Sequence, residues 1–224
     1  MPTFSFGKTL RPEPMSSHRV PILKPDQSYT FASYFKMKFP VAEILKELGV
    51  TFDVASIEFQ QTSQELLSVA DALKTRLENR RQRVRLTSEA ARREALVAPV
   101  LLEVADLTQA IVNIEYPVEV NQYLSGDLDY LLEAQHRVLV VEAKQANLTR
   151  GFTQLAMELI ALDQWVELSD PILYGAITTG DIWQFGSFNR VAKKITQDTM
   201  LYRVPTDLAQ LMQILVSILQ AEEG

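Results

Sequence analysis

The residues best suited to chemistry in this chain are two carboxylates and a lysine near the middle of the sequence. Asp129 precedes Glu142 by thirteen residues, and Lys144 completes a Glu-x-Lys arrangement that ends the apolar run 138–141. Two neighbouring carboxylates repel each other unless a cation lies between them. Carboxylate oxygens suit Mg²⁺ or Mn²⁺ better than Zn²⁺. The pattern therefore predicts a divalent-metal site with a lysine beside it.

Two predicted strands bring these residues together. Side chains alternate between the faces of a strand, so Glu142 and Lys144 point to the same side at the end of a strand expected over residues 137–143. Another strand is expected over residues 127–132, and the short connection between the two predicts an antiparallel hairpin. In such a hairpin Asp129 can lie beside Glu142.

Hydrophobic periodicity and turn residues predict the remaining elements. Helices are expected over residues 41–48, 62–83 (capped by Thr62 or Ser63), 87–106 (capped by Thr87 or Ser88), 149–166 and 206–219, and further strands over 50–59, 110–123, 172–178, 183–188 and 200–204. This order predicts an α/β (α+β) fold, in which helices flank a mixed β-sheet. We expect residues 1–86 to form an N-terminal arm with a helical/strand module, and residues 87–224 to form the core.

Composition narrows the class of protein. The chain has 224 residues, of which 47% are hydrophobic, a balance typical of one or two globular domains. It has no cysteine, so it can form neither disulfides nor thiolate-ligated zinc sites. Neither a signal-peptide pattern nor an apolar run long enough to span a membrane occurs. We expect a cytoplasmic protein without a membrane partner.

One segment is basic although the chain carries a net charge of −6. Eight of the twenty residues from 74 to 93 are Lys or Arg, and two are Glu. Such a strip is either a solvated helix face or a surface that contacts phosphates. For the second alternative, the candidate nucleic-acid-binding residues are Arg80, Arg81, Arg83, Arg85, Arg92 and Arg93.

Asp129 and Glu142-Ala143-Lys144 together resemble the metal site of the PD-(D/E)XK nuclease superfamily. The segment 88–101 is similar to the opening helix of the N-terminal nuclease domain in type I restriction enzyme motor subunits. The segment 172–185, with a Thr-x-Gly turn before Trp183, resembles the hairpin that follows in the same relatives. The resemblance covers about residues 87–190 and implies a restriction-endonuclease-like core.

The resemblance also implies roles for individual residues. Asp129, Glu142 and the backbone carbonyl of Ala143 are expected to hold Mg²⁺ or Mn²⁺. Lys144 is expected to orient or help deprotonate a water molecule, or to stabilise charge on the phosphate. Asp127 is the alternative to Asp129, because both share one face of their strand. We prefer Asp129, which directly precedes apolar strand residues as the family's aspartate does.

Two helices are expected to add polar residues to this site. Glu89 aligns with the buried face of its helix on a 100° wheel, whereas Glu94 lies at the edge of that face, so Glu89 is the candidate ancillary metal ligand. The alternative for Glu89 is an ordinary N-terminal helix charge. Gln154 is the positional match for a glutamine that the family carries on the next helix, and Glu158 stands where a tyrosine is usual. Because Gln154 points away from the apolar stripe on the wheel, we place it outside the catalytic set.

The resulting expectation is a Mg²⁺-dependent DNA endonuclease that hydrolyses phosphodiester bonds through Asp129, Glu142 and Lys144. The alternative is a catalytically silent protein of the same fold that binds nucleic acid or protein. A third possibility places a partner site in the front module, residues 28–85. The helices over 62–83 and 206–219 carry apolar surface that could form a homodimer, but we favour the alternative that they pack within one chain.

Overall fold

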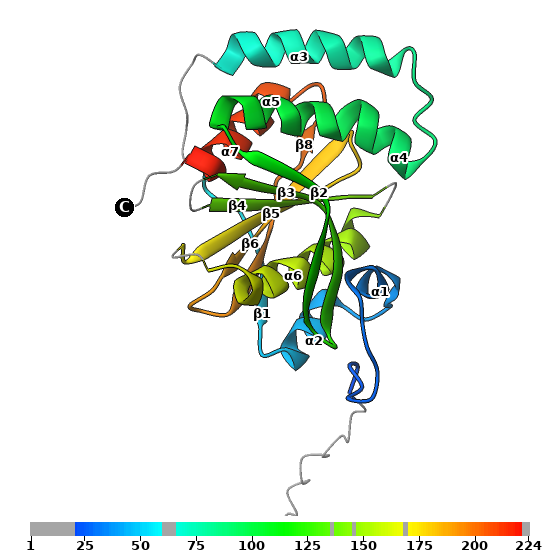
Figure 1. Ribbon diagram of the computed structural model, residues 1–224, viewed down its shortest axis with the longest axis vertical. Helices are drawn as coiled ribbons and strands as arrows, with labels where there is room; N and C mark the ends of the chain where they lie inside the picture. The colour runs from blue at the N-terminus through cyan, green and yellow to red at the C-terminus, as the bar shows by residue number, and fades with distance from the viewer. Residues whose placement is uncertain (1–20, 60–65, 135–136, 145–146, 168–169, 221–224) are drawn as a thin grey trace, which may run out of the picture.

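The protein is built around one mixed β-sheet between two layers of helices (Figure 1). The computed structural model describes residues 21–59, 66–134, 137–144, 147–167 and 170–220. The eight-stranded sheet has the order β1-β7-β6-β5-β4-β3-β2, and β8 pairs with β6 outside this path. The predicted α/β (α+β) class, a mixed sheet flanked by helices, is confirmed.

The elements have the following bounds. The helices are α1 (Phe31–Lys36), α2 (Val41–Glu47), α3 (Leu66–Arg81), α4 (Glu89–Arg92), the π-helical turn η1 (Arg93–Val97), α5 (Ala98–Thr108), α6 (Leu148–Trp165) and α7 (Leu208–Gln220). The strands are β1 (Thr51–Ala55), β2 (Ile111–Asn121), β3 (Leu124–Ala134), β4 (Arg137–Ala143), β5 (Ile172–Thr178), β6 (Ile182–Asn189), β7 (Lys194–Asp198) and β8 (Tyr202–Arg203). None of the described helices is long and apolar enough to cross a membrane.

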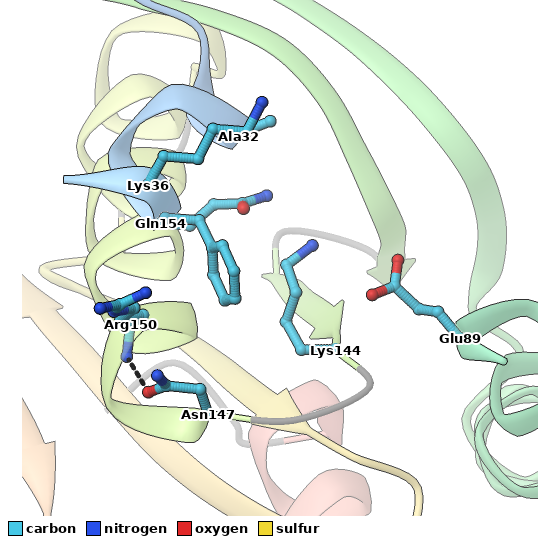
Figure 2. Close-up of a pocket in the computed structure, with 8 residues that line it drawn as sticks. Ala32, Lys36, Glu89, Lys144, Asn147, Arg150 and Gln154 are labelled. Atoms are coloured by element: carbon cyan, nitrogen blue, oxygen red, sulfur yellow. Dashed lines mark hydrogen bonds between the residues drawn. The ribbon is translucent and has the colours of Figure 1, made fainter. Parts of the chain in front are cut away.

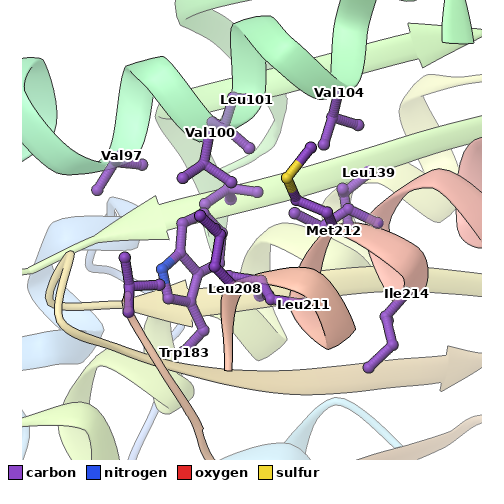
Figure 3. Packing of buried hydrophobic residues seen from close by; sticks show 14 of the residues in the cluster. Val97, Val100, Leu101, Val104, Leu139, Trp183, Leu208, Leu211, Met212 and Ile214 are labelled. Carbon is purple, nitrogen blue, oxygen red and sulfur yellow. The ribbon is translucent and has the colours of Figure 1, made fainter. Parts of the chain in front are cut away.

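An apolar cluster covers each face of the sheet. Alternation along β4 sends Leu139 and Val141 into the cluster with α3, α5 and α7, and Val138 and Val140 into the cluster with α1, α2 and α6. Figure 3 shows the first cluster, in which Trp183 packs among residues of α5 and α7. Strand β4 is therefore central and buried on both sides, which explains why it reads as a continuous apolar run.

Most predicted elements are confirmed, and two were missed. Strands β4 and β5 have their predicted bounds, whereas α1 and β7 were not predicted. Helix α1 has only six residues, too few to show a helical period, and β7 contains a single apolar residue, Ile195. The proposed capping residues Thr62 and Ser63 lie outside the described residues.

The helix predicted over residues 87–106 is present but irregular. Ser88 caps it, since its hydroxyl accepts a hydrogen bond from the Ala91 amide at 3.1 Å. The π-helical turn η1 ends two residues before Pro99. Proline lacks an N–H and its ring clashes with the carbonyl four residues earlier in a regular helix, and a wider turn relieves that contact. The extra width changes the phase between α4 and α5.

The N-terminal segment is packed into the rest of the chain. Strand β1 pairs in parallel with β7, α3 packs against α7, and α1 packs against α6. Elements from both sides of residue 86 thus share the sheet and both apolar clusters. The apolar faces of α3 and α7, considered for a dimer, are buried within the chain (for example Leu77 and Leu215). The boundary at residue 86 and the homodimer stay predictions.

Candidate active site

The β3–β4 hairpin places Asp129 and Glu142 opposite each other. The antiparallel ladder ends at the pair Tyr130 and Val141, so the next pair in the same register is Asp129 and Glu142. At this position a side-chain oxygen takes the place of a backbone acceptor. Asp129 Oδ2 accepts a hydrogen bond from the Ala143 amide at 2.8 Å. The two strands therefore separate where the carboxylates project, which opens one end of the hairpin.

Lys144 lies next to this carboxylate pair. Its Nζ forms an ion pair with Glu142 Oε1 and lies 5.7 Å from the centre of the Phe35 ring in α1. Burial lowers the pKa of Lys144, but attraction to Glu142 outweighs this effect and the net pKa is raised. Lys144 is thus a fixed cation at neutral pH, able to orient a water molecule or neutralise a phosphate.

Glu142 is fully buried and belongs to a polar cluster inside the α6 layer. The amide Nε2 of Gln154 donates to Glu142 Oε1 at 2.6 Å and to Glu158 Oε1 at 2.9 Å. Burial raises the pKa of Glu142 well above its usual range, and the charges of Glu158 and Asp129 raise it further. Burial also raises the pKa of Glu158, to about 7, against the opposing hydrogen bond from Gln154.

The expectation that Gln154 points away from the buried side of its helix was wrong, because the residue is only 3% exposed; its place outside the catalytic set stays a prediction. Every residue of α6 from Gly151 to Leu162 is buried, so this helix has no solvent face to which Gln154 could point. Glu158, the other residue of the cluster, was missed as a partner of Glu142. The available signal was their spacing: residues four apart on a helix share a face, and two polar residues on one face of an otherwise apolar helix need partners.

Asp129 rather than Asp127 takes part in this arrangement. Asp127 is exposed, whereas the Asp129 side chain is only 16% exposed. Arg93 Nη1 lies 3.3 Å from Asp129 Oδ1 and 3.4 Å from Glu115 Oε1. The guanidinium of Arg93 also lies 5.3 Å from the centre of the Tyr130 ring. One oxygen of Asp129 therefore faces a cation and the other faces a backbone N–H.

A pocket of about 470 Å³ opens beside Lys144 (Figure 2). It is lined by residues of α1, α4, α6 and the end of β4: Ala32, Phe35, Lys36, Glu89, Lys144, Asn147, Arg150 and Gln154. Glu89 is half-buried, and its charge contributes to the raised pKa of Lys144. Glu94 is exposed. The structure thus brings Glu89 to the same pocket as Lys144.

The six candidate arginines of the basic strip fall into two groups: three form ion pairs with carboxylates of the chain, and three are exposed. Arg81 and Arg92 both form ion pairs with Asp181 at 2.5 Å, and Arg93 pairs with Asp129. Arg92 also donates to the carbonyl oxygen of Thr179 at 3.1 Å. Arg80, Arg83 and Arg85 are exposed. Three of the six candidate arginines therefore bind carboxylates of the chain itself, and two of them, Arg81 and Arg92, hold the turn at Thr179 and Asp181.

The donor set at the hairpin fits a hard divalent cation. The buried Oε2 of Glu142 has no hydrogen-bond partner among the described residues, which leaves an acceptor for a ligand. Within the same residues no group of three or more His, Asp or Glu side chains is arranged to hold a metal ion. Mg²⁺ in proteins is commonly held by one or two carboxylates with several waters, and Asp129 and Glu142 supply two.

Comparison with known proteins adds no assignment. No protein-family model matches the chain, and no curated protein matches it.

Proposed function

We propose that this chain is a cytoplasmic, Mg²⁺-dependent DNA endonuclease that acts through Asp129, Glu142 and Lys144, as its resemblance to PD-(D/E)XK nucleases implies. One observation carries the proposal. The hairpin ladder ends where two carboxylates from adjacent strands face each other, with a lysine bonded to one of them at the edge of a pocket. Charges of this kind are costly to bury, and such clusters occur often at functional sites.

The residues of the chain have distinct roles in this proposal. Asp129, Glu142 and the carbonyl of Ala143 hold Mg²⁺ or Mn²⁺, with Glu89 as a further candidate. When bound, the ion lowers the pKa of a coordinated water and neutralises charge on the phosphodiester. Lys144 orients the attacking water or stabilises negative charge on the phosphate. Gln154 fixes the Glu142 carboxylate through its 2.6 Å hydrogen bond.

The test is cleavage of plasmid and single-stranded DNA with Mg²⁺ or Mn²⁺ present. We expect cleavage by the wild type and a loss of at least about 100-fold in both variants, since Glu142→Ala removes a ligand of the proposed ion and Lys144→Ala removes the cation beside the phosphate. Asp127→Ala is the matched control, because it removes an exposed carboxylate from the same strand. Equal activity in all four proteins, or metal-independent cleavage, would contradict the proposal.

A specific observation favours a second candidate, a catalytically silent protein that binds nucleic acid or protein. Both carboxylates already face cations of the chain: Glu142 pairs with Lys144, and Asp129 with Arg93. Such pairs compensate the charges of the carboxylates with no metal ion. The second candidate predicts that the wild type binds DNA with the same affinity with and without Mg²⁺ and cleaves none of the substrates.

A further inference from the structure

The pocket beside Lys144 is lined by one carboxylate, Glu89, and by two further cations that form no ion pair with the described residues. Lys36, the last residue of α1, and Arg150, in the first turn of α6, both line the pocket and are both exposed. Among the described residues neither side chain forms an ion pair. The arginines of the basic strip differ, since Arg81, Arg92 and Arg93 each pair with a carboxylate.

The surroundings of this pair favour an anion as well. Lys144 lies between Glu89 and the wall formed by α1 and α6 (Figure 2). Asn147 caps the eighteen-residue helix α6 at the same place, and its side chain accepts from the Arg150 amide at 3.1 Å. The positive end of the helix dipole therefore points toward the pocket.

One buried polar side chain in the wall of the pocket is only partly hydrogen-bonded. The Gln154 side chain lines the pocket although the residue is only 3% exposed. Its Nε2 donates to two carboxylates, which leaves Oε1 without a hydrogen-bond partner among the described residues. Because this Oε1 is an acceptor, it cannot donate to a phosphate oxygen; the groups of the pocket that favour a phosphate are Lys36, Arg150 and Lys144.

From these observations we infer that Lys36 and Arg150 bind a backbone phosphate of a nucleic-acid strand, next to the phosphate that contacts Lys144. The inference rests on the proposed function. It adds α1, in the N-terminal segment, to the surface that would contact the nucleic acid, because Lys36 is the last residue of that helix. Strand register places Lys144 at the hairpin, and the packing of α1 against α6 places a second cationic group at the same pocket. Lys36 and Arg150 line the same pocket as Lys144, so a strand whose phosphate contacts Lys144 can present a neighbouring phosphate to these two cations.

The test measures binding without catalysis. A fluorescently labelled oligonucleotide, single-stranded or duplex, is titrated with the full chain in EDTA at several salt concentrations. Lys36→Gln and Arg150→Gln are each expected to weaken binding and to reduce the slope of log K against log salt by about 0.7 on a single strand or about 0.9 on a duplex. Lys24→Gln and Lys46→Gln remove the same charge from exposed positions outside the pocket and should leave the slope unchanged.

Each outcome separates this site from the nuclease proposal. Unchanged affinity and slope in the pocket variants, or equal losses in the control variants, would overturn the phosphate site whether or not the wild type cleaves DNA. The expected slopes together with a wild type that never cleaves would support the site and overturn the nuclease. Binding of inorganic phosphate that no oligonucleotide displaces would also overturn the inference, because the ligand would then be a free anion.

Discussion

At the scale of single residues, Glu142 shows how the fold holds a charged group in its interior. Its carboxylate contacts Lys144 and the side-chain amide of Gln154, and that amide also donates to Glu158. A buried ion pair is seldom a net source of stability, because desolvation offsets the attraction between the charges. The cost of burying these charges supports the proposal that the cluster is a functional site.

Glu158 leads to a prediction about stability and pH in the metal-free protein. An ordinary glutamate releases its proton near pH 4.5, whereas Glu158 in the folded chain holds it to about pH 7. Between these values the folded state binds more protons than the unfolded state, so the free energy of unfolding falls as pH rises. For Glu158 this fall amounts to roughly 3 kcal/mol in total.

The prediction is tested with Glu158→Gln. The variant keeps an acceptor for Gln154 but cannot ionise beside Glu142, Asp129 and Lys144. Denaturant unfolding in EDTA should therefore show the variant gaining stability relative to the wild type between pH 5 and pH 8. Glu119→Gln, at an exposed position of β2, provides the control. A stability difference that is the same at both pH values would show that Glu158 is not the group concerned.

At the scale of elements, α6 determines the inner wall of the site by its close approach to the sheet. Glycines allow this approach: a Cβ on Gly186 of β6 would lie 2.7 Å from Cε2 and 2.9 Å from Cζ of the Phe152 ring. A Cβ on Gly175 of β5 would lie 2.7 Å from Leu155 Cδ1. The side chains of α6 therefore fill the space that these residues leave, and this packing holds Gln154 against Glu142.

Substitution Gly186→Ala should consequently destabilise the protein. The ring of Phe152 is rigid and buried, so it must shift away from the sheet, and overpacking of this kind typically costs about 1–3 kcal/mol. The measurement is the midpoint of urea unfolding. Ser187→Ala changes the neighbouring, half-buried position on the other face of the strand and should change stability less. A stable Gly186→Ala protein would mean that α6 lies further from β6 than the structure shows.

Helix α1 connects the N-terminal segment to the site. Phe31 and Tyr34 are buried, and the Tyr34 hydroxyl donates to the carbonyl oxygen of Tyr123 at 2.7 Å, which joins α1 to the β2–β3 hairpin. Phe35 and Lys36 instead line the pocket. A helix of six residues thus uses one side for packing and the other for the candidate site.

At the scale of the whole molecule, residues before 87 complete the fold. Strand β1 extends the sheet beyond β7, while α1 and α3 cover apolar surface on opposite faces. We expect a fragment of residues 87–224 to expose apolar residues of both clusters and to lose the cooperative thermal unfolding of the full chain. The reason is that removing α1, α2 and α3 exposes apolar surface that is buried in the full chain. A fragment with a sharp transition and native near-UV circular dichroism would support the predicted boundary at residue 86.

The net charge of −6 also acts at this scale. An acidic protein repels nucleic acid on average, so binding must depend on local groups of cations. Half of the arginines proposed for this role pair with Asp181 or Asp129, and the pocket supplies Lys36 and Arg150 in addition.

The sequence by itself determined the β3–β4 hairpin and the three candidate site residues on it, Asp129, Glu142 and Lys144. Alternation along β4 and a short connection place Asp129, Glu142 and Lys144 together, since strand period and hairpin pairing are local properties. Only the tertiary structure decided which groups surround them. Gln154, Glu158 and Lys36 come from helices, and a helical wheel cannot show whether a polar face meets solvent or another layer. That depends on how α1 and α6 pack across the sheet, which is set by contacts between residues far apart in the chain.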